Sequence, residues 1–164
     1  MLTDSNATNL SAFPVKDSSM QMVQPIIIVD DSSDDRMLLS RYLRALLPEN
    51  QALVCLRSGK ELLEYLAQLE MENIEANEFE VEIPSMIFLD LMMPGMDGVD
   101  TLTAMRRQPI WADVAVTLIT CSRNDVAVKR AEKAGANAFM PKPFSERDVI
   151  QALHKDSNYS PTIF

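Results

Sequence analysis

The sequence predicts an α/β fold in which five parallel strands form one doubly wound sheet with helices on both faces. Two patterns support this prediction: short apolar runs rich in β-branched residues, and longer segments between them in which leucines recur at helical spacing. Five strand–helix pairs follow one another along the chain, which is typical of a parallel sheet with right-handed crossovers. A length of 164 residues also fits one domain with a sizeable core.

Each predicted strand is a short apolar run that ends at turn-forming or polar residues, as strands buried on both faces usually do. The third runs directly into Asp90. The strands are predicted at residues 26–29, 52–56, 86–89, 114–119 and 138–140.

Each predicted helix begins at a residue whose side chain can cap a helix amino terminus. The second and fifth helices open with capping boxes, Ser58 to Glu61 and Ser145 to Asp148. The fourth helix is expected to stop at Gly135. In chain order, the capping residues are Ser32 or Ser33, Ser58, Asp97, Asn124 or Asp125, and Ser145.

Three segments lie outside this pattern. Residues 1–24 are polar and without periodicity, which predicts a flexible N-terminal arm, and residues 156–164 are expected to form a C-terminal tail. The domain itself is placed at residues 25–155. Residues 70–82 hold six glutamates and no lysine or arginine, which indicates a solvated acidic extension of the second helix and the loop after it.

The composition excludes several classes of function. A net charge of −9 and a pI of about 4.6 argue against a nucleic-acid-binding surface. No apolar run reaches membrane-spanning length and no signal peptide is evident, so we expect a cytoplasmic protein without membrane contact. Cys55 and Cys121 fall in apolar runs and have no metal-ligand spacing, so we expect buried free thiols.

Charged and hydroxyl side chains stand at the ends of four predicted strands. Asp30 and Asp31 follow the first strand, Asp90 the third, Thr120 the fourth and Lys142 the fifth. In a doubly wound sheet these strand ends converge on one crevice. Clustered carboxylates suit hydrated Mg²⁺, while an ammonium and a hydroxyl suit phosphate oxygens. Together they indicate a metal-assisted phosphoryl site in which Asp90 is the nucleophile.

At these residues the sequence resembles the receiver domain of two-component response regulators, over roughly residues 25–154. The resemblance implies the flavodoxin-like strand order 2-1-3-4-5. It rests on four segments, which are Val29–Asp31, Phe88–Gly98, Leu118–Thr120 and Phe139–Phe144.

The resemblance also implies roles for the residues at the strand ends. Asp90 would accept a phosphoryl group from a histidine kinase or a phosphotransfer protein. Mg²⁺ would be held by Asp30, Asp31, Asp90 and the backbone carbonyl of Met92.

Further roles follow from the same resemblance. Lys142 would neutralise the phosphoryl group, Thr120 would move to bond it, and Phe139 would be the switch aromatic. The Lys142–Pro143 peptide bond would be cis. Since no output domain follows the last helix, the chain is expected to be a stand-alone receiver that signals through contact with a downstream protein; the oligomeric state is left open.

Two other functions share parts of this pattern. A metal-dependent phosphohydrolase with an aspartyl-phosphate intermediate usually carries a second aspartate two residues after the nucleophile as general acid, and Met92 stands there. A pseudo-receiver that only binds partners usually lacks one of the acids or the lysine, and all are present here. Both readings therefore rank below a phosphorylatable receiver, which is not an enzyme although it carries its own phosphorylation and dephosphorylation chemistry.

Overall fold

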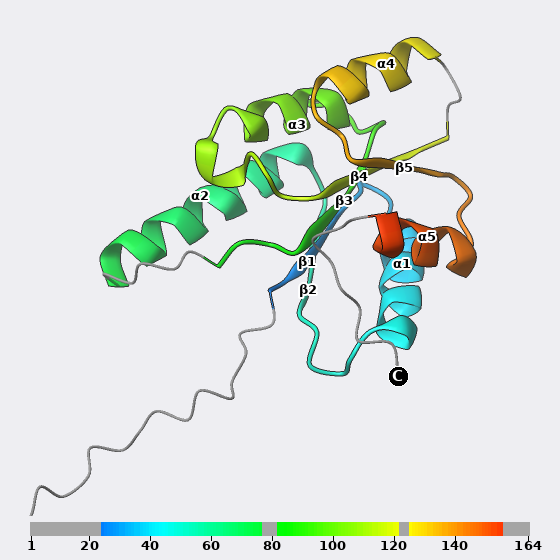
Figure 1. Ribbon diagram of the computed structural model, residues 1–164, viewed down its shortest axis with the longest axis horizontal. Coiled ribbons are helices and arrows are strands. Elements are labelled where there is room, and N and C mark those ends of the chain that lie inside the picture. Colours follow the sequence, from blue (N-terminus) through cyan, green and yellow to red (C-terminus); the bar gives the residue numbers. More distant parts are fainter. Residues whose placement is uncertain (1–23, 77–81, 122–124, 156–164) are drawn as a thin grey trace, which may run out of the picture.

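The computed structural model describes residues 24–76, 82–121 and 125–155. The proposed arm, apart from Gln24, and the proposed tail lie outside these residues. The described chain forms a single five-stranded sheet in the order β2-β1-β3-β4-β5, and every neighbouring pair is parallel (Figure 1). The fold class and strand order expected from the sequence are confirmed. The strands are β1 (Ile26–Val29), β2 (Leu53–Leu56), β3 (Met86–Asp90), β4 (Val116–Thr120) and β5 (Ala138–Pro141).

The helices follow the strands in the expected alternation, and most predicted caps are formed. The Ser32 hydroxyl accepts a hydrogen bond from the Asp35 backbone N–H, and the Asp97 carboxylate accepts one from the Asp100 N–H. A 3-10 turn, η1 (Pro109–Trp111), was not predicted. The helices are α1 (Ser33–Leu46), α2 (Gly59–Ala76), α3 (Gly98–Arg106), α4 (Asp125–Lys133) and α5 (Glu146–Lys155).

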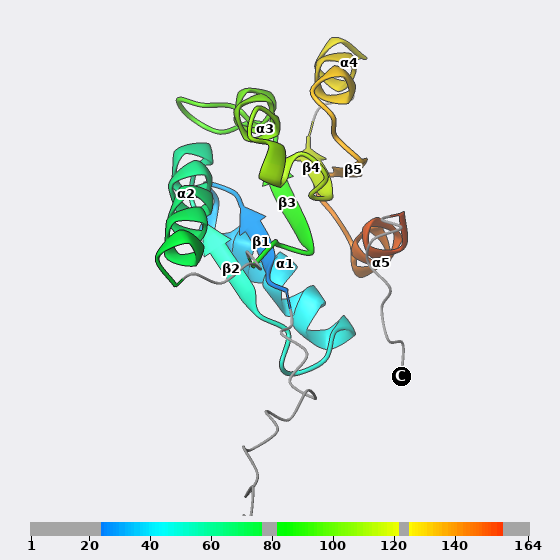
Figure 2. The same cartoon turned by 60° about the vertical axis from the view of Figure 1, so that its left-hand side comes forward.

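The sheet is covered on both faces, and the alternation of side chains along each strand divides the core in two. In β1, Ile27 and Val29 pack toward α2 and α3, whereas Ile26 and Ile28 pack toward α1 and α5. Figure 2 shows α2 and α3 on one side of the sheet and α1 and α5 on the other. All four residues of β1 are fully buried, which explains why this strand reads as a continuous apolar run.

The start of the fourth strand differs from the sequence-based expectation. It begins at Val116 rather than Val114, although Val114 and Ala115 are buried just before it. The second helix extends to Ala76 and takes in the first half of the glutamate-rich segment, as the sequence indicated. Among the described helices, none is long and apolar enough to cross a membrane.

The prediction of buried cysteines is wrong, because both thiols are exposed. Cys55 lies in β2, an edge strand, with its sulfur 3.4 Å from the Ser40 hydroxyl of α1. Cys121 follows the last residue of β4 and so lies outside the strand itself. An apolar run predicts burial only where neighbouring elements cover both faces, and neither position has that cover.

Gly98 allows the first turn of α3 to lie against the end of β3. A Cβ at this position would clash with the carbonyl oxygen of Asp90 and lie 2.8 Å from the Cα of Leu91. We expect Gly98→Ala to lower the free energy of unfolding by about 2 kcal/mol, because backbone atoms cannot yield as a side chain would. Urea denaturation measures the change.

Gly95 supplies the matched control. Its φ is +82°, and a Cβ there would meet nothing within 4 Å. Gly95→Ala should therefore cost only the left-handed conformation, about 1 kcal/mol. A Gly98→Ala variant that loses no more stability than Gly95→Ala would contradict the close approach.

Candidate functional site

Three charged side chains meet at the carboxyl ends of the strands. Asp30 follows β1, Asp90 ends β3, and Lys142 follows β5. The register pairs Val29 with Leu89, so the two aspartates extend side by side from neighbouring strands. Each of the three lies two residues after a side chain that packs toward α1 and α5. Because side chains alternate along a strand, all three point to that same face of the sheet.

The carboxylates of Asp30, Asp31 and Asp90 form one cluster, with an oxygen of each within 4.8 Å of the others. Asp30 is 1% exposed and Asp90 is 3% exposed, whereas Asp31 is open to solvent. Backbone N–H groups hold the two buried carboxylates in place. Ser32 donates to Asp30 Oδ1 over 2.9 Å, and Met92 donates to Asp90 Oδ1 over 3.3 Å.

Lys142 supplies the positive charge of the site. Its Nζ lies 2.7 Å from Asp30 Oδ2, 2.9 Å from Asp35 Oδ2 and 3.5 Å from Asp90 Oδ2. The Lys142 backbone N–H donates to the carbonyl of Thr120, which ties the residue to the end of β4. The peptide bond to Pro143 is cis, as expected.

This arrangement opposes ionisation of Asp90. Burial, followed by the negative charge of Asp30, raises the pKa of Asp90 to about 6, while Lys142 and the Met92 N–H act in the opposite direction. Burial lowers the pKa of Lys142, but its bonds to Asp30 and Asp35 outweigh that effect and leave the pKa raised. The site therefore has more negative charge than one ammonium can balance.

The cluster has the chemistry of a site for a hard divalent cation. All its side-chain donors are carboxylate oxygens, which Mg²⁺ prefers. Asp30 Oδ2 is buried, and the Lys142 ammonium that lies 2.7 Å from it is shared with Asp35 and Asp90. A divalent cation would add positive charge at these oxygens and offset the burial and the repulsion that raise the pKa of Asp90. The residues present thus fit Mg²⁺.

Thr120 and Phe139 lie on the other face of the sheet from the charged group. Thr120 ends β4 and is buried. It lies two residues after Leu118, so its side chain points to the same face of the sheet, the face that packs toward α2 and α3. Phe139 pairs with Leu118 in the neighbouring strand and is half-buried against the same part of the core. The structure therefore brings Asp30, Asp31, Asp90 and Lys142 together and places Thr120 and Phe139 beside them on a separate face.

Asp35 also belongs to the site, although the sequence pattern indicates only an acid in the first turn of a helix. Only three residues separate β1 from α1, so the first turn of α1 lies over the end of that strand. Since Asp30 is a site residue, an acid five positions later was a usable signal.

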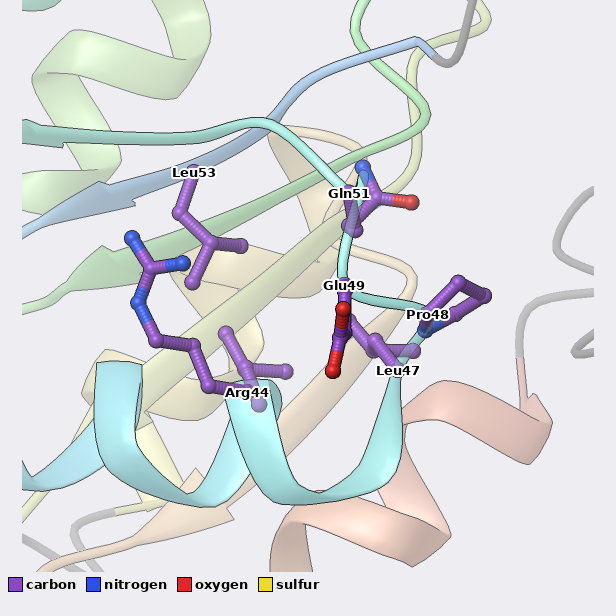
Figure 3. Close-up of a pocket in the computed structure, with 7 residues that line it drawn as sticks. Arg44, Leu47, Pro48, Glu49, Gln51 and Leu53 are labelled. Carbon is purple, nitrogen blue, oxygen red and sulfur yellow. The ribbon is translucent and has the colours of Figure 1, made fainter.

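A pocket at the opposite end of the strands does not share the acidic chemistry of the site (Figure 3). It lies where α1 ends and β2 begins, and Glu49 contributes its single carboxylate. The Gln51 amide in its wall donates to the carbonyl of Gln24 over 2.8 Å. The lining residues are Leu43, Arg44, Leu47, Pro48, Glu49, Gln51 and Leu53.

Comparison with known proteins agrees with this geometry. The family model described as the response regulator receiver domain matches residues 26–154. The chemotaxis protein CheY of Bacillus subtilis is 27% identical over 139 residues, which span 84% of this chain and 100% of that protein. The probable methanogenesis regulatory protein FilR2 of Methanothrix harundinacea is 28% identical over 134 residues, 82% of this chain and 81% of that protein.

The fold has solved counterparts as well. The receiver domain of the histidine kinase CKI1 from Arabidopsis thaliana, solved in complex with Mg²⁺, superposes with a TM-score of 0.65 at 21% identity, over 78% of this chain and 90% of that one. Several other relatives are longer transcriptional regulators, and this chain spans less than half of their length.

The raised pKa of Asp90 predicts a pH-dependent stability. The folded state holds the Asp90 proton up to about pH 6, whereas the unfolded chain releases it near its ordinary value of 3.8, so stability falls as the pH rises through this window. Without divalent metal, Asp90→Asn should raise the free energy of unfolding at neutral pH by on the order of 2 kcal/mol. The gain should disappear below about pH 4, where both states are protonated.

Urea unfolding with EDTA at several pH values measures this difference. Asp34→Asn removes an exposed acid of α1 and serves as the control, for which we expect little change. An Asp90→Asn protein that is no more stable than wild type at neutral pH would show that the buried carboxylate is already compensated.

Proposed function

The chain belongs to the response regulator receiver domain family, and on this premise we propose that it is a signalling protein phosphorylated on Asp90. The donor is a phosphohistidine of a histidine kinase or a phosphotransfer protein. A carboxylate oxygen of Asp90 attacks phosphorus, an oxygen–phosphorus bond forms, and the phosphorus–nitrogen bond to the imidazole breaks. The released imidazole keeps the electron pair and takes up a proton.

The single observation that best supports this role is the setting of Asp90. Its carboxylate is buried at a strand end, beside two other acids and 3.5 Å from a lysine ammonium. A purely structural acid gains nothing from such repulsion, whereas a nucleophile that works with a cation requires it. The match to relatives of the same length range supports the assignment to phosphorelay signalling.

We assign the metal site to the carboxylates of Asp30, Asp31 and Asp90 together with the backbone carbonyl of Met92. Bound Mg²⁺ would supply positive charge to the phosphoryl oxygens. The two buried acids, held by backbone N–H groups, present their remaining oxygens in a fixed direction, so little reorganisation is needed on binding.

The remaining site residues act after the phosphoryl group arrives. The Lys142 ammonium bonds one phosphoryl oxygen and offsets its charge. The Thr120 hydroxyl donates to another. Phe139 shares a face of the sheet with Thr120, so a shift at Thr120 reaches the aromatic ring through packing. The rearranged surface is then recognised by a downstream protein in the cytoplasm, and neither nucleic acid nor membrane takes part.

The phosphohydrolase alternative finds no support in the site. Met92 occupies the position that such an enzyme needs for a general acid, and its side chain is apolar and 62% exposed. The pseudo-receiver alternative conflicts with the presence of all three acids and the lysine in one cluster.

Phosphorylation tests the proposal directly. Incubation with Mg²⁺ and acetyl phosphate should add the mass of one phosphoryl group, because the cation compensates the charge that otherwise opposes attack. Asp90→Asn and metal chelation should each abolish the gain, measured by intact-protein mass spectrometry. Asp34→Asn, with the same change of charge on an exposed helix position, should be phosphorylated normally. Incorporation that persists in Asp90→Asn would place the nucleophile elsewhere.

A further inference from the structure

Asp35 competes with Asp30 and Asp90 for the only close ammonium among the described residues, that of Lys142. Asp35 Oδ2 lies 2.9 Å from Lys142 Nζ and accepts its hydrogen bond, whereas Asp90 Oδ2 is 3.5 Å from the same atom. The contact joins α1 to the end of β5 across 107 residues of sequence. The Lys142 side chain is 18% exposed and that of Asp35 35%, so the pair is partly shielded from water.

We propose that Asp35 is a positioning residue that holds the Lys142 ammonium on the α1 side of the site, away from Asp90, until a phosphoryl group draws it across. This inference rests on the proposed function, since it concerns the lysine and metal carboxylates of the same site. It assigns to Asp35 a role in setting how strongly the site binds both the metal and the phosphoryl group.

The first consequence concerns the metal. Lys142 and a divalent cation compete for the carboxylates of Asp30 and Asp90, because both are positive and both need the same oxygens. Asp35 offers the ammonium a carboxylate that lies outside the metal cluster. When Asp35 loses its charge, Asp30 and Asp90 remain as the close acidic partners of Lys142 in the described part of the chain, and the metal must compete harder for them.

The second consequence has the opposite sign. A phosphoryl group on Asp90 attracts the ammonium, but in wild type Lys142 must first leave its 2.9 Å contact with Asp35. Without the Asp35 charge, and with the metal bound to Asp30, the lysine has one competing partner fewer and bonds the phosphoryl oxygen more readily. Removal of one carboxylate should therefore weaken metal binding and strengthen phosphoryl binding at saturating metal.

A purely structural role for Asp35 predicts something different. Its backbone N–H donates to the Ser32 hydroxyl, and its charge lies in the first turn of α1, where an acid stabilises the helix. Loss of that effect would lower stability without moving the two affinities in opposite directions. Asp34 lies in the same helical turn and carries the same charge, and no bond between its carboxylate and Lys142 is present, so Asp34→Asn is the matched control.

The metal arm uses Mn²⁺ as the probe, with the free ion counted by electron paramagnetic resonance. Asp35→Asn should raise the Mn²⁺ dissociation constant about threefold or more, whereas Asp34→Asn should change it much less. In a Lys142→Met background, Asp35→Asn should lose most of its effect, because the competing ammonium is gone. Circular dichroism checks that each variant is folded.

The phosphoryl arm uses beryllofluoride, a mimic of the phosphoryl group, at saturating Mg²⁺. Backbone amide signals in NMR spectra report the half-saturating concentration, which Asp35→Asn should lower by about threefold while Asp34→Asn leaves it near wild type. If Asp35→Asn and Asp34→Asn behave alike, or if both affinities of Asp35→Asn fall, the tether is refuted while the proposed function stands. If the wild type binds neither Mn²⁺ nor beryllofluoride, the proposed function itself fails.

Discussion

The candidate site is organised around two buried carboxylates, which the parallel register holds side by side although they repel each other. Val29 and Leu89 are paired in neighbouring strands, so the aspartates that follow them emerge side by side with almost no access to water. No change of rotamer separates groups fixed at adjacent strand ends, and each is also anchored by a backbone N–H. The balance must come from a cation, and the described chain supplies one, Lys142, from the far strand. Burial and the negative charge of Asp30 raise the pKa of Asp90, and the deficit of positive charge gives the cluster the chemistry of a divalent-ion site.

The fold could be read from the sequence because its elements obey independent rules that agree. The fully buried central strands appear as continuous apolar runs, and Ser32 and Asp97 cap helices where the pattern places them. Expectations failed where a rule depends on neighbours that the sequence does not name. Cys55 is exposed because its strand lies at an edge, and η1 was missed because three residues give no periodic signal. The start of β4 shifted from Val114 to Val116 for a similar reason, since boundaries depend on local hydrogen bonds more than on hydropathy.

The candidate site was predictable to the extent that it is built from strand ends. Asp30, Asp90 and Lys142 converge as the topology requires, and the acid cluster includes Asp31. Asp35 was not predicted, because its contact depends on how α1 crosses the end of β5, and this crossing is set by packing of the whole α1–α5 face. Sequence periodicity places a residue on one face of a helix, but it does not say which distant side chain that face meets. Pairing between residues 107 positions apart is information that only the folded chain contains.

The division of the site between two faces of the sheet suggests how a local charge change could travel outward. The acids and Lys142 lie on the face covered by α1 and α5, whereas Thr120 and Phe139 lie on the face that α4 also adjoins. Of the described side chains of α4, only the small Ala131 is fully buried; Ala127 in the helix and Ala134 just after it are partly buried against the same cluster. Arg130 of α4 forms ion pairs with Asp97 and Asp100 over 3.9 and 3.7 Å. They are largely solvent-exposed, so they add little to the stability of the helix. A helix that buries so little apolar surface is held less firmly than α1 or α5. The rigid, charged face is therefore suited to chemistry, and the lightly packed face to the change of surface that a partner would recognise.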